Sequence, residues 1–163
     1  MDAPMNPSPN ATGRHVIHDF AGLVAALQSD GAPLAVQPGK AELRILIDEP
    51  WLKTALWLHW DAQHALLHLL LPIGDPIPAE RLSAIESLIA RINHRLVMPG
   101  FGLDDTNAVA YFRLCLPREE GLTVEQVRTL LRTAIGTVRD ALPLFVDVLQ
   151  GGLSPQEAIL RAR

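Results

Sequence analysis

Residues 53–71 read KTALWLHWDAQHALLHLLL, two apolar runs on either side of a short polar segment. Two such runs joined by a short turn predict an antiparallel hairpin. If the turn is centred on Ala62-Gln63, Leu58 lies opposite Leu67, and successive side chains point to opposite faces of the sheet. One face of the hairpin is then apolar and predicted to enter the core, whereas the other face mixes histidines with large apolar residues.

The mixed face is the feature that most strongly indicates a function. Five large apolar side chains are expected on it, two of them from neighbouring strands. They are Trp57, Leu66, Leu70, Leu46 and Tyr111. An antiparallel sheet with helices on one side leaves its other side exposed, and large apolar groups there usually contact a partner. We therefore expect these residues to contact another protein or a second subunit, the alternative being cover by residues 143–163 of the same chain.

Outward from the hairpin, the apolar spacing alternates between the helical and the extended period. Helices are predicted over residues 19–30, 78–97 and 123–142, followed by one or two further turns over 144–149 and a short helix from 155. Strands are predicted over residues 42–48, 53–60, 64–71, 101–104 and 108–116. The order α-βββ-α-ββ-α-α predicts an α+β fold in which a five-stranded antiparallel sheet carries helices mainly on one face.

Local signals mark several helix ends. Asp19 is a suitable N-cap for the first helix, and Thr123 and Ser154 each open a capping box with Gln or Glu three residues later. Asn93 is expected to hydrogen-bond the turn over residues 97–100 and so to fix a helix-to-strand connection. Pro143 is expected to kink or break the third helix.

Composition indicates one compact domain. The chain has 163 residues, of which 48% are apolar, so a single domain over 15–163 can bury a sizeable core; residues 1–14, with three prolines, are expected to form a disordered tail. That tail lacks the features of a signal peptide, and no run approaches the roughly 20 apolar residues of a membrane span. A net charge of −4 argues against nucleic-acid binding, and one cysteine, Cys115, suits a cytoplasmic location.

The densest group of candidate metal ligands lies in the hairpin. It comprises His59, Asp61, His64 and His68. These residue types bind zinc, but alternation also gathers histidines on a polar sheet face without any metal. We expect a half-exposed sheet face here, with no catalytic residues and no cofactor, and Cys115 is expected to be a packed structural thiol. A small-ligand or metal-binding protein, a hydrolase included, that uses these histidines is the alternative.

Several short segments between Ile92 and Ile159 resemble the YbjN family of bacterial proteins, described as sensory transduction regulators. They are INHRL at 92–96, GFGLDD at 100–105, the strand 109–116, Phe145, and GGLSPQEAI at 151–159. The first half of the chain matches the family in layout. The resemblance implies a fold similar to that of type III secretion chaperones and a non-enzymatic module that binds a protein segment or forms a homodimer. It carries over no catalytic residue.

Overall fold

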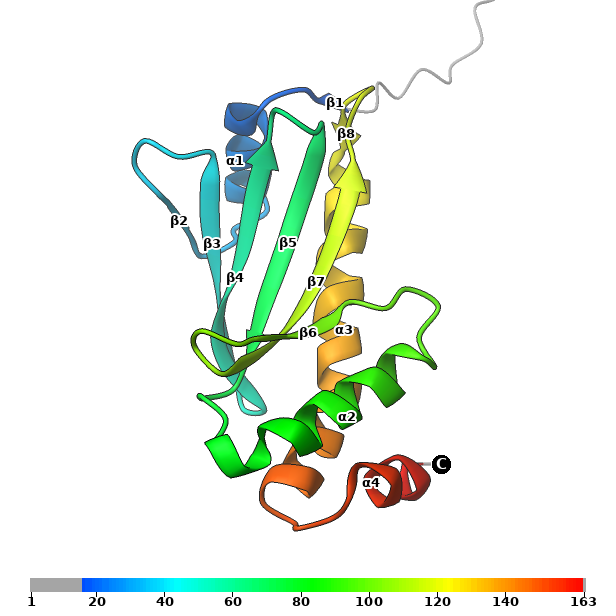
Figure 1. The fold of residues 1–163 in the computed structure, drawn as a ribbon. Helices are drawn as coiled ribbons and strands as arrows, with labels where there is room; N and C mark the ends of the chain where they lie inside the picture. The colour runs from blue at the N-terminus through cyan, green and yellow to red at the C-terminus, as the bar shows by residue number, and fades with distance from the viewer. Residues whose placement is uncertain (1–15, 163) are drawn as a thin grey trace, which may run out of the picture.

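The computed structural model describes residues 16–162, which form an α+β fold built on antiparallel strands (Figure 1). The strands are β1 (Val16–Ile17), β2 (Leu34–Val36), β3 (Glu42–Glu49), β4 (Leu52–Asp61), β5 (Leu66–Ile73), β6 (Phe101–Asp104), β7 (Val109–Pro117) and β8 (Leu122–Thr123). The helices are α1 (Phe20–Ser29), the 3₁₀ turn η1 (Ala79–Arg81), α2 (Leu82–Asn93), α3 (Val124–Leu149) and α4 (Pro155–Arg161). The expected disordered tail over 1–14 lies outside the described residues.

Within residues 16–162 the main sheet has six strands in the order β2-β3-β4-β5-β7-β6, so the prediction of five strands was wrong. The missed strand is β2, which has three residues and pairs with one edge of β3. A segment this short shows no alternation that could be recognised in the sequence. The element order also differs from the prediction, because β1 and β8 pair as a separate two-stranded sheet beside the start of α3.

The hairpin of β4 and β5 forms as predicted, but its register differs by two residues. Leu58 pairs with Leu69 rather than with Leu67, because the turn holds four residues between Asp61 and Leu66. Ala65, the last of the four, has a left-handed backbone with φ of 52°. A shift of two residues preserves the alternation of side chains, so both predicted faces have the predicted members.

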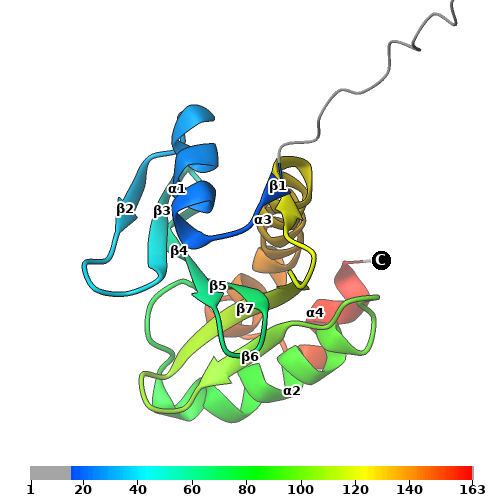
Figure 2. The same ribbon diagram turned by 90° about the horizontal axis from the view of Figure 1, so that it is seen from above.

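The helices α1 and α3 and the core lie on one side of the main sheet. Figure 2 shows α1 and α3 on the same side of the strands, and α3 contacts β5 and β7. The Phe101 ring lies 4.8 Å from that of Phe112 and 5.8 Å from that of Phe145, which joins strands and helix in one core. The terminal helix α4 packs on α2 and α3. The predicted alternative, in which the C-terminal segment covers the opposite face, is therefore wrong.

The predicted caps are present. The Asp19 side chain accepts the amide hydrogen of Gly22, and both capping boxes, at Thr123 and Ser154, are closed. The second predicted helix is shorter than expected, because a 3₁₀ turn precedes α2 and the α-helix ends at Asn93. Asn93 bonds the following turn as predicted: its Oδ1 accepts the amide hydrogen of Gly100 at 3.2 Å.

Pro143 does not break α3, which runs continuously from Val124 to Leu149. The apolar stripe of the helix continues past the proline, since Phe145 and Val148 are buried with Ala141. Burial of this stripe offsets the backbone hydrogen bond that proline cannot donate. Across the described part of the chain, no helix combines the length and apolar character required to span a bilayer.

Candidate functional site

The face of the main sheet that is turned away from the helices is called here the outer face. Strand register arranges its side chains in rows that run across the strands. Two neighbouring rows, called the apolar rows, consist of Leu46, Ala55, Pro72 and Tyr111, and of Arg44, Trp57, Leu70 and Arg113. The next row, called the histidine row, consists of Glu42, His59, His68 and Cys115. The outer face thus has an apolar part and a polar part that adjoin.

Four of the five predicted contact residues lie in the apolar rows. Leu46 has 62% of its surface exposed, while Trp57, Leu70 and Tyr111 are half-buried. Leu66 does not join them, because on β5 the histidine row separates it from Leu70. The structure therefore brings four of these residues into one patch and leaves the fifth apart.

Two neighbours partly cover the aromatic rings of the apolar rows. The Arg44 guanidinium lies over the Trp57 ring, 3.7 Å from the ring centroid, in a cation–π contact. Tyr111 lies against Gly102 on the edge strand β6, where a Cβ atom would come within 2.5 Å of the phenol ring. Glycine at position 102 is therefore what allows Tyr111 to lie flat at this edge.

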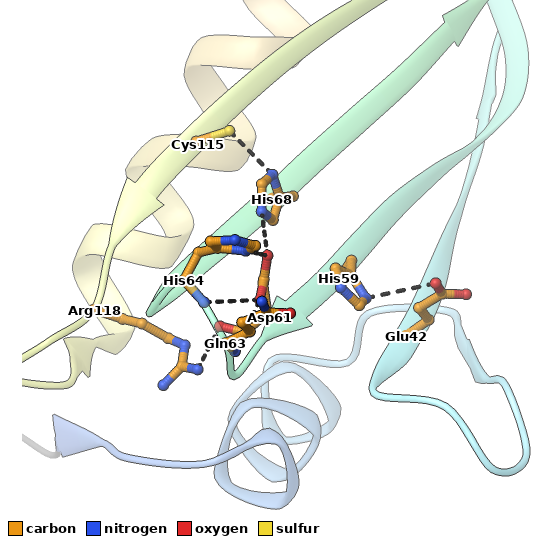
Figure 3. A network of polar contacts seen from close by, with 8 residues as sticks. All are labelled: Glu42, His59, Asp61, Gln63, His64, His68, Cys115 and Arg118. Atoms are coloured by element: carbon orange, nitrogen blue, oxygen red, sulfur yellow. Dashed lines mark hydrogen bonds and ion pairs between the residues drawn. The ribbon is translucent and has the colours of Figure 1, made fainter.

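At the polar end of the outer face, Asp61 organises the hairpin turn. Its carboxylate accepts the amide hydrogens of Gln63 at 2.9 Å and His64 at 3.0 Å. The same carboxylate lies 2.7 Å from Nδ1 of His64 and 3.3 Å from Nε2 of His68, and Figure 3 shows both rings turned toward it. The hydrogen bond from the His64 ring, followed by that from the His64 amide, holds the pKa of Asp61 well below its usual range. Asp61 is therefore an anion around which the turn is built.

The fourth candidate ligand, His59, is paired differently. Its Nδ1 lies 3.5 Å from the Glu42 carboxylate, and its ring centroid is 5.9 Å from that of His68. Among residues 16–162, no three His, Cys, Asp or Glu side chains are arranged to hold one metal ion. The hairpin histidines instead lie within hydrogen-bonding or close contact distance of carboxylates.

Cys115 is the residue of this face whose setting was predicted wrongly. It is exposed rather than packed, and its Sγ lies 3.2 Å from Nδ1 of His68, which it faces across β5 and β7. Alternation along β7 places Cys115 on the same face as Tyr111 and Arg113, which is the signal that was available in the sequence. Its neighbour could not be found from the sequence, because the two residues are 47 positions apart.

A small hollow separates the apolar rows from the histidine row. Its volume is about 150 Å³, and its lining includes Trp57, Leu70, His59 and His68. Sites for drug-sized ligands typically enclose roughly 300–1,000 Å³. The hollow suits one inserted side chain better than a small-molecule substrate.

The family model YbjN, described as "Putative bacterial sensory transduction regulator", matches residues 21–146. No curated protein matches the chain. The crystal structure of YbjN from E. coli superimposes with a TM-score of 0.63 at 11% identity, covering 83% of this chain and 96% of that one.

A second solved structure, the HopA1–SchA chaperone–effector complex, contains a chain that superimposes with a TM-score of 0.52 at 22% identity. The match covers 74% of this chain and 91% of the other. The α+β fold with its antiparallel sheet is thus similar to that of a chain in a type III chaperone–effector complex, as the resemblance implied. Since the family model spans most of the chain, the protein belongs to the YbjN family.

Proposed function

We propose that this protein is a non-enzymatic interaction module of the cytoplasm, a regulator or a chaperone-like protein, that binds an apolar segment of another protein on its outer face. The observation that carries the proposal is the apolar rows themselves. The helices α1 and α3 lie on the opposite side of the sheet, and the C-terminal helix α4 packs on α2 and α3 rather than on these rows. Burial of an apolar side chain as exposed as Leu46 by a partner contributes favourable free energy to binding.

The composition of the patch supports a protein ligand. Trp57 and Tyr111 are of the residue types that dominate binding energy at protein interfaces, as is arginine. Arg44 and Arg113 stand at the two sides of Trp57 and Leu70 in one row. Their charges complement a segment that carries acidic residues beside its apolar anchor.

One of the comparison structures supports the same class of ligand. That structure is a chaperone in complex with its effector protein, so a chain of similar fold binds protein there. A second copy of this chain, giving a homodimer, is the competing occupant. The hydrolase alternative has no comparable support, because the hollow beside the histidines is small.

The test places a photo-cross-linking amino acid at position 46 of the full chain in the native bacterium. Position 160, on α4, is the matched control, because Leu160 is 51% exposed on the helical side of the molecule. We expect position 46, and not position 160, to cross-link to another protein. Mass spectrometry then identifies the cross-linked segment.

Binding of that segment is next measured as a synthetic peptide. Leu46→Asp should weaken peptide binding at least tenfold, and Leu160→Asp should leave it unchanged. Leu46→Asp is preferable to a charged residue at position 57, where Arg44 lies over the Trp57 ring. The proposal would be replaced by a homodimer interface if position 46 cross-linked only to a second copy of this chain. Light scattering should then give a dimer mass for the wild type and a monomer mass for Leu46→Asp.

A further inference from the structure

A continuous hydrogen-bonded relay ends at the exposed thiol of Cys115. Its Sγ lies 3.2 Å from Nδ1 of His68, and Nε2 of the same ring lies 3.3 Å from the Asp61 carboxylate (Figure 3). Nucleophile, base and orienting carboxylate are the three parts by which proteins activate a thiol. In this relay each ring nitrogen of His68 has a defined partner.

The surrounding backbone fixes the relay. His68 and Cys115 are register partners on β5 and β7, so their side chains project side by side from the same face. Asp61 is held in its turn by the Gln63 and His64 amides, and Arg118 donates a hydrogen bond of 2.6 Å to its carbonyl oxygen. The imidazole is thus positioned by regular structure rather than by chance contact of mobile side chains.

We propose that Cys115 is a covalent modification site, at which the His68–Asp61 pair activates the thiol for exchange with low-molecular-weight disulfides. His68 takes the proton of Cys115 at Nδ1, and the imidazolium is stabilised by the ionised Asp61. The thiolate then attacks one sulfur of the disulfide, forming a new S–S bond as the old one breaks. The departing thiolate takes the proton from His68, so that one mixed disulfide and one free thiol result.

The charges around the thiol suit such a reactant. Arg113 lies two residues from Cys115 on the same face of β7, where its guanidinium can attract a carboxylate of the incoming disulfide. The other titratable or charged groups nearby are Glu42, His59, Asp61, His64, His68 and Arg118. Since Cys115 is exposed on a strand, the disulfide needs no enclosed pocket.

The expected size of the effect follows from thiol chemistry. A free thiol with a pKa of about 8.5 is roughly 3% thiolate at pH 7, so complete ionisation could raise the reaction rate at most about thirtyfold. An acidic thiolate is also a weaker nucleophile, which lowers this gain severalfold. With a Brønsted coefficient of about 0.4–0.5, the net gain reaches about three- to fourfold at most, and activation of about threefold is therefore expected.

The experiment measures the rate at which oxidised glutathione forms a mixed disulfide with the full chain at pH 7, by intact-protein mass spectrometry. His68→Asn keeps a hydrogen-bonding group near Cys115 but cannot hold the proton, and should slow the reaction about threefold. His59→Asn, the matched control, changes the neighbouring histidine of the same row and should alter the rate less than twofold. Added imidazole should restore much of the rate of His68→Asn.

A second measurement needs no variant: the folded wild-type protein should react faster than the same chain unfolded in urea at the same pH. The proposal would be overturned if wild type and folded His68→Asn reacted at the same rate, or if both histidine variants slowed the reaction equally. It would also be overturned if the folded chain reacted more slowly than the unfolded one. None of these assays includes a protein partner. Absence of a cross-link from position 46 would therefore refute the proposed function without affecting the inference on Cys115. Equal reaction rates for wild type and His68→Asn would refute that inference without affecting the proposed function.

Discussion

Replacing Asn93 by alanine should destabilise the connection between α2 and β6. The Asn93 side chain makes three hydrogen bonds there: Nδ2 donates to the Phe101 carbonyl at 2.9 Å, and Oδ1 accepts the amide hydrogens of Gly100 at 3.2 Å and Phe101 at 3.1 Å. Because β6 is an edge strand, these backbone groups have no further strand to pair with. They hold Phe101 where its ring packs on Phe112 and Phe145.

The magnitude follows from the three bonds. Each contributes roughly 0.5–1.5 kcal/mol net, and the site is partly exposed, so water replaces some of what is lost; the sum is about 2–3 kcal/mol for Asn93→Ala. For a chain of this size each kcal/mol lowers Tm by about 2–4 °C. Urea titration should show a lower midpoint at an unchanged slope, because the folded state stays compact.

Two variants sharpen this test. Asn93→Asp keeps the acceptor for both amide hydrogens but sets an anion against the Phe101 carbonyl, so an intermediate loss of stability is expected. Asn107→Ala removes a hydrogen bond of 2.7 Å that Nδ2 of Asn107 donates to the Asp104 carboxylate in an exposed turn, and should lower the free energy of unfolding less than Asn93→Ala does. A loss below about 0.5 kcal/mol for Asn93→Ala would refute the structural role given to this side chain.

Three further variants test other features of the fold. Asp61→Asn should lower the stability by about the same amount at pH 7 and pH 5, because a carboxyl with a lowered folded-state pKa stabilises the protein above its unfolded value near 4. This contribution is lost progressively below that value, so thermal melts should show a smaller difference between variant and wild type at pH 3 than at pH 5. Gly102→Ala should displace the Tyr111 ring, changing the near-UV circular dichroism and costing about 1–3 kcal/mol by overpacking. Gly136→Ala, where an added Cβ meets none of the described atoms within 4 Å, should instead stabilise α3 by about 0.5–1 kcal/mol in the same melts.

Some features of the structure could be predicted because they depend on neighbours in the chain. The caps at Thr123 and Ser154 depend on residues three positions away, and both are present. The two faces of the hairpin depend on alternation, which survives the error of two residues in register. The register itself was missed because a left-handed Ala65 lengthens the turn, and alanine does not signal that conformation.

Other features could not be predicted because no local pattern encodes them. The strand β2 has three residues and exists through pairing with β3. The continuity of α3 through Pro143 depends on burial of Phe145 and Val148 in the core rather than on helix propensity. In each case a tertiary contact outweighs a weak or contrary local preference.

The candidate site divides in the same way. By itself, the sequence determined which residues share the outer face, since alternation along each strand assigns Trp57 and Cys115 to it. Only the tertiary structure decided which of them touch. The pairing of β5 with β7 sets Cys115 beside His68, and the packing of α4 on α2 and α3 leaves Leu46 uncovered. Face membership follows from the two-residue period of one strand, whereas contact depends on register between strands distant in the chain, which the whole core fixes together.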